Sequence, residues 1–119
     1  MKFIKCEDCE AIAVVLNDGK CCVGEEKELL ANTVDAAVEK HVPSVHVEGN
    51  IIKVQVGEVE HPMIKEHFIQ WIAVETKKGL MVKKLSPEEK PYAEFIVEGE
   101  EVVAVYEYCN LHGLWKKEM

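Results

Sequence analysis

The sequence has no arginine, and it has no long apolar run. A transmembrane helix needs about 20 predominantly apolar residues, so the sequence predicts no membrane span. All 14 basic residues are scattered lysines against 22 acidic residues, which gives a formal net charge of −8. Nucleic-acid phosphates bind a stripe of basic side chains, so this balance argues against a nucleic-acid partner. Met1–Lys5 opens like a signal peptide, but Cys6-Glu7-Asp8 follows before any apolar stretch forms, and we expect a cytoplasmic protein.

The 119 residues suit one domain, or one small domain with a mini-domain attached. Because 48% of the residues are apolar, the chain can fill a core, which excludes wholesale disorder. Four of the five cysteines lie within the first 22 residues, and the fifth is Cys109. An odd number of cysteines argues against a secreted fold held together by disulfides alone. Clustered thiols in a reducing compartment indicate a metal site.

From Val42 onward the pattern is that of short strands. Ile52, Val54 and Val56 alternate with polar residues, and Glu48-Gly49-Asn50 is typical of a hairpin turn. We expect strands over Val45–Val47, Ile51–Val56, Phe68–Glu75, Leu80–Leu85, Tyr92–Val97 and Val102–Tyr108. Phe68–Glu75 is apolar on both faces, as a central strand would be. The sequence therefore predicts an all-β chain whose larger part is an Ig-like antiparallel β-sandwich.

The N-terminal segment has a different character. Ile12–Leu16 suits a short strand, and the turn signal Asn17-Asp18-Gly19 folds the chain back. Residues 25–40 are mostly polar, and we expect a linker with one helical turn. The four thiols of this segment form a knuckle that suits one tetrahedral zinc or iron ion. The alternatives are buried free cysteines or a redox disulfide. The thiols are Cys6, Cys9, Cys21 and Cys22.

A second set of metal-binding residue types is spread along the rest of the chain. A single histidine is usually an ordinary surface or core residue. Here His61, His67, Cys109 and His112 lie at or just beyond the ends of expected strands, where loops converge. Together with His41 they offer four imidazoles and one thiolate, a mixed set that suits iron better than structural zinc. Five protein ligands leave a sixth octahedral position open for chemistry.

Several motifs closely resemble superoxide reductase of the desulfoferrodoxin type, and the resemblance covers nearly the whole chain. They are Glu39-Lys40-His41-Val42-Pro43, His61-Pro62-Met63, His67 before an aromatic residue, and Cys109-Asn110-Leu111-His112-Gly113. The head resembles desulforedoxin through its C-x-x-C and its later Cys-Cys pair. The resemblance implies a desulforedoxin-like metal domain and linker over residues 1–35 and a catalytic β-sandwich over residues 36–119.

The resemblance also implies roles for individual residues. His41, His61, His67 and His112 match the equatorial ligands of the catalytic iron, and Cys109 matches its axial thiolate. Glu39 matches a glutamate that can occupy the sixth position of the oxidised iron, and Lys40 matches a lysine near the open face. Cys6, Cys9, Cys21 and Cys22 match the ligands of a second iron. The hairpin between Cys9 and Cys21 is shorter than in desulforedoxins, which leaves zinc open at that site. His46 matches no ligand, and we expect it on the surface.

The reaction implied is the one-electron reduction of superoxide to hydrogen peroxide. The family also suggests a rubredoxin-like electron donor and a homodimer. One alternative is a non-catalytic iron protein that only transfers electrons. Another is a zinc knuckle on an Ig-like interaction module, which would leave Cys109 and the histidines unexplained.

Overall fold

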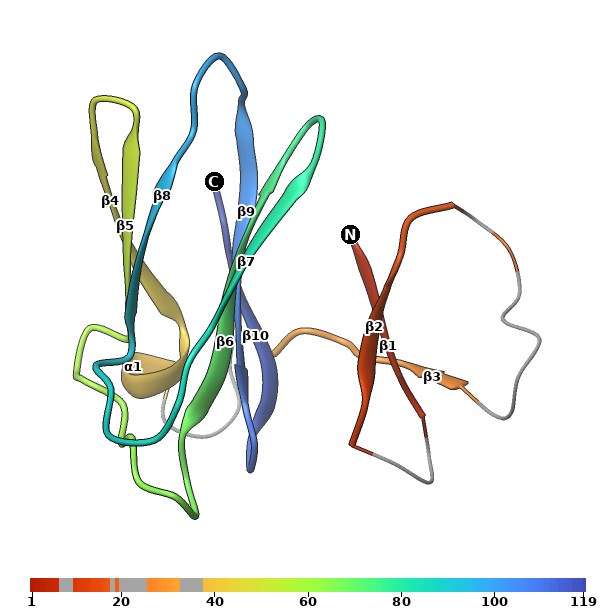
Figure 1. The fold of residues 1–119 in the computed structure, drawn as a ribbon, viewed down its shortest axis with the longest axis vertical. Helices are drawn as coiled ribbons and strands as arrows, with labels where there is room; N and C mark the ends of the chain where they lie inside the picture. Colours follow the sequence, from red (N-terminus) through yellow and green to blue (C-terminus); the bar gives the residue numbers. More distant parts are fainter. Residues whose placement is uncertain (7–9, 18, 20–25, 33–37) are drawn as a thin grey trace. The chain divides into compact units, whose positions relative to one another are not determined.

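The computed structural model describes residues 1–6, 10–17, 19, 26–32 and 38–119 (Figure 1). The chain divides into two compact units, Met1–Leu30 and Ala31–Met119. Within the described residues, no helix is long and apolar enough to cross a membrane.

The first unit is a small antiparallel sheet in the order β2-β1-β3. Its strands are β1 (Lys2–Cys6), β2 (Ile12–Val15) and β3 (Glu26–Glu28). β2 confirms the strand predicted there. β1 was not predicted, and β3 is a strand at the start of the segment 25–40, which was expected to be a linker with one helical turn. The sequence Glu-Lys-Glu of β3 has no apolar alternation, and it is a strand because its backbone pairs with β1 in the register Ile4↔Glu28.

The second unit contains two antiparallel sheets, as predicted. One has the order β10-β9-β6-β7 and the other the order β4-β5-β8. The expectation of one helical turn is also confirmed by α1, whereas β10 was not predicted. The elements of this unit are α1 (Val38–His41), β4 (Pro43–Glu48), β5 (Ile51–Val56), β6 (Ile69–Thr76), β7 (Leu80–Lys84), β8 (Tyr92–Ile96), β9 (Val102–Cys109) and β10 (Gly113–Glu118).

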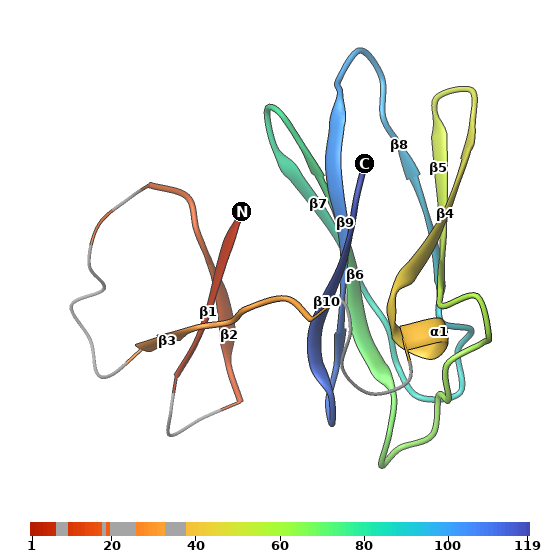
Figure 2. The same cartoon turned by 180° about the vertical axis from the view of Figure 1, so that it is seen from behind.

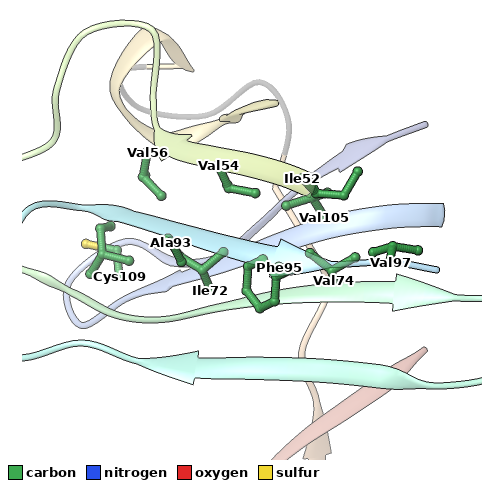
Figure 3. Packing of buried hydrophobic residues seen from close by; sticks show 11 residues of the cluster. Ile52, Val54, Val56, Ile72, Val74, Ala93, Phe95, Val97, Val105 and Cys109 are labelled. Carbon is green, nitrogen blue, oxygen red and sulfur yellow. The ribbon is translucent and has the colours of Figure 1, made fainter. Parts of the chain in front are cut away.

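The core lies between the two sheets (Figure 3). Alternate residues of β5 point into it, so that Val54 and Val56 are fully buried. β6 is a central strand between β9 and β7, and Ile72 and Val74 are fully buried. Cys109 belongs to this cluster, at one end of the row of side chains. The thiol of Cys109 therefore lies at the boundary between the apolar core and the loops.

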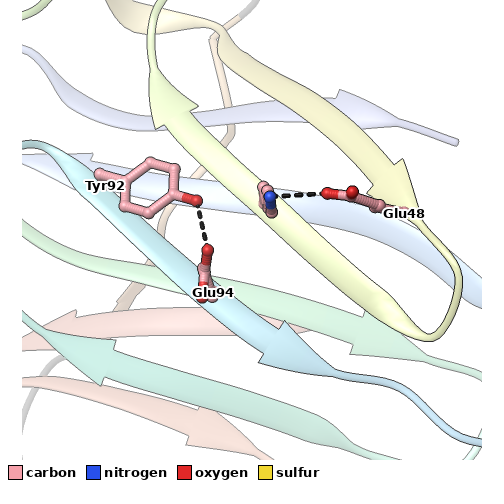
Figure 4. Close-up of polar contacts among 4 residues, drawn as sticks. Glu48, Tyr92 and Glu94 are labelled. Carbon is pink, nitrogen blue, oxygen red and sulfur yellow. Dashed lines mark hydrogen bonds and ion pairs between the residues drawn. The ribbon is translucent and has the colours of Figure 1, made fainter.

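The outer face of the β4-β5-β8 sheet is polar (Figure 4). Lys53 on β5 forms an ion pair with Glu48 at 2.6 Å, and the hydroxyl of Tyr92 donates to Glu94 at 2.7 Å. His46 on β4 is exposed on the surface, as expected. Buried and polar residues alternate along strands whose sheet has one buried and one solvated face. Exposed ion pairs such as Lys53–Glu48 contribute little to stability.

Three connections lie at the same end of the sandwich, as Figures 1 and 2 both show. They are α1, the loop 57–68 between β5 and β6, and the turn between β9 and β10. The hairpin β4–β5 and the turn β6–β7 lie at the opposite end. Each of the three connections carries at least one predicted ligand, so the topology brings the C-terminal histidines and Cys109 to one place.

A β-bulge interrupts the pairing of β6 with β9 next to this end. Cys109 pairs with Ile69 and Tyr108 pairs with Trp71, so Gln70 is an extra residue on β6. Because the strand gains one residue there, Ile69 is fully buried like Cys109 opposite it. Bulges of this kind redirect side chains and are common beside functional sites.

Candidate metal centre

His41 is the last residue of α1, and its ring is buried. It stacks on the indole of Trp115 from β10, with ring centroids 4.7 Å apart and an angle of 13° between the planes. Trp115 is itself fully buried, and its Nε1–H donates to the carbonyl oxygen of His112 at 3.1 Å. The indole of Trp115 thus orients the ring of His41 by stacking and holds the backbone of His112 by a hydrogen bond.

His61 and His67 both come from the loop 57–68. The Nδ1 atom of His61 lies 2.7 Å from the carbonyl oxygen of Pro62, so its Nε2 atom is the nitrogen that faces the centre. A hydrogen bond at one ring nitrogen sets which nitrogen a metal uses. The backbone N–H and C=O of His67 are both hydrogen-bonded to Ile64, at 3.0 and 3.1 Å. Hydrogen bonds therefore hold both histidines of the loop, His61 through its ring and His67 through its backbone.

Cys109 and His112 are held by the tight connection between β9 and β10. Cys109 ends β9, and Gly113 begins β10 with a φ of 80°. Such a positive φ is readily adopted by glycine, which has no Cβ. The Sγ atom of Cys109 lies 3.6 Å from His61 Nε2 and 3.8 Å from His112 Nδ1. The sulfur therefore faces one ring nitrogen from each of two connections.

The four imidazoles form a closed cycle of neighbours. Ring centroids are 4.7 Å apart between His41 and His61 and 4.6 Å apart between His61 and His67. They are 5.1 Å apart between His67 and His112 and 4.7 Å apart between His112 and His41. Each ring thus has two others beside it, and adjacent planes are inclined by 60° to 84°. This is the arrangement expected of four rings directed at one central point.

Four donor atoms lie within 4.8 Å of one another, a spacing that one metal ion can bridge. They belong to His41, His61, Cys109 and His112. His67 is outside this group of four although its ring completes the cycle. The structure thus brings all five predicted ligands of the C-terminal site together, with His67 at the margin of the donor set.

The protonation of these groups favours metal binding. Burial, reinforced by the neighbouring imidazoles, lowers the pKa of His41 to about 4. Burial also lowers the pKa of His61 to about 4, although the bond to Pro62 acts in the opposite direction. Burial, followed by the charge of His112, lowers the pKa of His67. At neutral pH these rings are uncharged, which is the form that ligates a metal.

The thiol of Cys109 is subject to opposing effects. Burial raises its pKa, and this effect outweighs the lowering by the backbone N–H groups of Leu111 and His112, which donate to the sulfur. Donors aimed at a sulfur stabilise the thiolate, which is the form that binds metals. The turn 110–112 therefore supplies backbone support to the ligand that precedes it.

Two buried ring nitrogens in the cycle have no hydrogen-bond partner. They are Nδ1 of His41 and Nε2 of His67, and the other such atoms among the described side chains are the two carboxyl oxygens of Glu107. Burial raises the pKa of Glu107 well above its ordinary value, so it is a neutral acid. Buried polar atoms without partners call for an explanation, and a bound ion is one. Four imidazoles with one thiolate fit iron well.

Glu39 and Lys40 precede His41 on α1, and both are exposed. The positive charge of Lys40 contributes to the lowered pKa of His41, His61 and His67. Glu39 is not part of the donor group. It lines a surface cavity together with Glu58 and Lys117. The charge of Lys40 thus acts on rings of the cycle, and Glu39 lies beside a neighbouring cavity.

Comparison with known proteins decides the family. The sequence model for desulfoferrodoxin matches residues 33–118. The chain belongs to the desulfoferrodoxin family. A desulfoferrodoxin from Desulfarculus baarsii is 44% identical over 122 residues, covering 99% of this chain and 96% of the relative. A desulfoferrodoxin from Clostridium acetobutylicum is 50% identical over 94 residues, covering 77% of this chain and 72% of the relative.

A solved structure agrees with this family assignment. The superoxide reductase from Treponema pallidum superimposes with a TM-score of 0.77 and is 38% identical. The alignment covers 92% of this chain and 93% of that protein. The resemblance to desulfoferrodoxins that the sequence motifs indicate is therefore confirmed, and so is the predicted all-β fold.

In this desulfoferrodoxin the N-terminal site is only partly described. Cys6 ends β1 and is half-buried. Cys9, Cys21 and Cys22 lie outside the described residues, so the four-thiolate centre remains a prediction. Sequence reasoning did not identify the supports of the C-terminal site, which include Trp115 beside His41 and Asn110, whose side chain binds the backbone on either side of His67. The motif that contains Asn110 was visible in the sequence, but only the structure shows what its side chain contacts.

Proposed function

We propose that this protein is a superoxide reductase, which reduces superoxide with one electron and two protons to hydrogen peroxide. The observation that carries the proposal is the closed cycle of four imidazoles with the Cys109 sulfur beside it. His41, His61, His67, His112 and Cys109 would hold one iron. When bound, that iron supplies the single electron, and a thiolate ligand increases its electron density.

The chain's own residues create the conditions for this reaction. Four imidazoles add no charge and one thiolate would cancel only part of the charge of a bound ferrous ion, so the centre would keep a small positive charge that attracts a small anion. The net charge of −8 repels superoxide at long range, but salt screens this repulsion beyond about 8 Å. Local charge at the mouth of the site therefore controls the encounter.

Lys40 provides that local charge. Its charge contributes to the lowered pKa of three of the four rings, which supports a role in attracting the anion and in donating a proton to the peroxide product. Lys40→Ala should slow the second-order reaction of the reduced protein with superoxide by about tenfold, which corresponds to about 1.4 kcal/mol, and should weaken its dependence on ionic strength. Pulse radiolysis at several salt concentrations measures both effects.

Lys78→Ala is the matched control for Lys40→Ala. Lys78 is exposed in the turn after β6, and its loss changes the net charge by the same amount. Its rate constant should remain close to that of the unmodified protein. If the two variants react at the same rate, Lys40 is an ordinary surface lysine.

Glu39 would bind the iron when the iron is oxidised. Its carboxylate precedes two residues of the site, and a change in the α1 segment would bring it to the sixth position of the oxidised iron. Glu39→Ala should shift the visible spectrum of the oxidised protein and tighten azide binding several-fold, with little change in the first encounter with superoxide. Glu58→Ala removes a neighbouring carboxylate of the same cavity and should leave the spectrum unchanged. An identical spectrum for Glu39→Ala between pH 5 and 9 would contradict the role.

The N-terminal unit would hold a second metal, iron or zinc. Cys6, Cys9, Cys21 and Cys22 supply four thiolates, which suit a closed tetrahedral site. Such a site stabilises a small unit that buries little apolar surface. A rubredoxin-like protein would supply electrons, and the chain would form a homodimer in the cytoplasm.

One experiment tests the proposed function as a whole. The purified full-length protein should contain iron, show an iron–thiolate band in its visible spectrum, and produce one hydrogen peroxide for each superoxide consumed without releasing dioxygen. A colourless zinc protein would contradict it. An iron protein that neither binds azide nor consumes superoxide would instead be a carrier of electrons.

A further inference from the structure

We propose that Asn110 is a positioning residue that holds His67 in the ligand set of the metal centre. This inference rests on the proposed function, because it concerns a ligand of the proposed iron. It assigns a role to a side chain that would not itself touch the metal.

The side chain of Asn110 forms hydrogen bonds on both sides of His67. Its Nδ2 donates to the carbonyl oxygen of Glu66 at 3.0 Å, and its Oδ1 accepts from the backbone N–H of Phe68 at 3.0 Å. The backbone N–H of Asn110 also donates to the carbonyl oxygen of Phe68 at 3.2 Å. One residue therefore contacts the peptide groups immediately before and after the imidazole.

Ile64 completes this arrangement from the other side. Its backbone accepts from the N–H of His67 at 3.0 Å and donates to the C=O of His67 at 3.1 Å. Five successive backbone groups, from the C=O of Glu66 to the C=O of Phe68, thus have partners. Three of the five partners are atoms of Asn110, two of its side chain and one its backbone N–H, so loss of the side chain would leave the Ile64 pair and one backbone bond on this part of the loop.

The location of Asn110 gives these contacts their importance. It directly follows Cys109 and lies two residues before His112, whereas His67 comes from a loop without strand pairing of its own beyond the contact with Ile64. The ring of His67 is next to those of His61 and His112 but outside the group of four close donors. The position of His67 therefore depends more than that of the other ligands on hydrogen bonds from outside its loop. Asn110 supplies such bonds and connects His67 to the segment that carries Cys109 and His112.

Two substitutions separate the contacts of the amide. Asn110→Leu keeps the approximate size of the side chain and removes its hydrogen bonds to Glu66 and Phe68, together with the 4.0 Å contact between its Oδ1 and Cys109 Sγ. Asn110→Asp keeps an acceptor for Phe68 N–H and removes the donor to Glu66. The control is Thr76→Val at the opposite end of β6, because Thr76 Oγ1 likewise donates to Glu100 at 2.7 Å and accepts from Gly79 N–H at 3.0 Å.

The measurements use full-length, iron-loaded protein. Loss of a residue that orients a metal ligand typically weakens binding by about 10–100-fold, so Asn110→Leu should release ferrous iron to a competing chelator at correspondingly lower chelator concentration. The electron paramagnetic resonance spectrum of its oxidised iron should broaden or split. Hydrogen exchange at the Phe68 amide should accelerate in Asn110→Leu and remain slow in Asn110→Asp. Thr76→Val should show none of these changes, even if its melting temperature falls.

The outcomes distinguish the inference from the proposed function. If unmodified protein binds no iron at this site, the proposed function fails. If it binds iron and Asn110→Leu shows the same iron affinity and the same resonance spectrum, the positioning role is wrong. It is equally wrong if Thr76→Val loses iron as readily, since general destabilisation would then explain the result. Should Asn110→Leu fail to fold, rapid exchange of the Phe68 amide in Asn110→Asp would still contradict the hydrogen-bond assignment.

Discussion

Cys109→Ser should abolish the iron–thiolate absorption band of the C-terminal centre and reduce the rate of superoxide reduction by at least 100-fold. The sulfur lies 3.6 Å from His61 Nε2 and 3.8 Å from His112 Nδ1, inside the group of close donors. A serine hydroxyl there remains protonated at neutral pH and is a poor ligand, since soft thiolate donors are what distinguish this site. Visible spectroscopy and pulse radiolysis on the same preparation measure the two effects.

Two comparisons make this result specific. Cys6→Ser should alter the metal of the N-terminal unit and leave the band and the reaction of the C-terminal centre nearly unchanged. Circular dichroism should show that Cys109→Ser is folded, because a hydroxyl in the core costs only about 1–3 kcal/mol. If the C-terminal band persists at full strength in folded Cys109→Ser, Cys109 is not a ligand.

Gly57→Ala should lower the iron content of the protein and destabilise it by about 1–3 kcal/mol. A Cβ atom at Gly57 would lie 2.7 Å from the carbonyl oxygen of Glu39, 2.9 Å from the carbonyl carbon of Lys40 and 3.0 Å from the carbonyl oxygen of Val42. All three are backbone atoms, so a change of side-chain rotamer cannot relieve the contact. The α1 segment would have to move, and His41 would move with it.

Gly79→Ala is the matched control for this substitution. Its added Cβ would meet no atom within 4 Å, and its φ is not in the left-handed region. Urea unfolding of the iron-loaded and iron-free proteins, with iron measured by mass spectrometry, compares the two variants. Equal midpoints and equal iron content would show that the space beside Gly57 adjusts without cost to the site.

Local patterns were sufficient for much of the sandwich. The alternation of Ile52, Val54 and Val56 predicts β5 because each second residue faces the core, and the length of the apolar run from Phe68 predicts a strand buried on both faces. β10 has no such signal, because Trp115 is followed by Lys116, Lys117 and Glu118. Its strand conformation results from pairing with β9 across the tight connection at Gly113.

The candidate site likewise has features that the sequence shows and features that only the structure shows. The ligand types and the motif Cys109-x-x-His112 are visible in the sequence, and the structure brings these residues to one end of the sandwich. The supports are not visible, because each depends on a contact between distant segments. Gly57 packs against the backbone of α1, Trp115 stacks on His41, and Asn110 binds the loop around His67. Contacts between such distant segments leave no periodic pattern of residues in the sequence.

The pairing of Ile69 with Cys109 makes the short segment between His67 and this pair intolerant of changes in length. Successive residues of a strand point to opposite faces and advance by about 3.3 Å. Deleting Phe68 would leave Ile69 opposite Cys109 but displace the preceding imidazole by about that distance. A metal–ligand bond of about 2 Å cannot absorb such a shift. Natural variation in length in this region should therefore fall before His67, in the loop, and be excluded from the segment between His67 and Ile69.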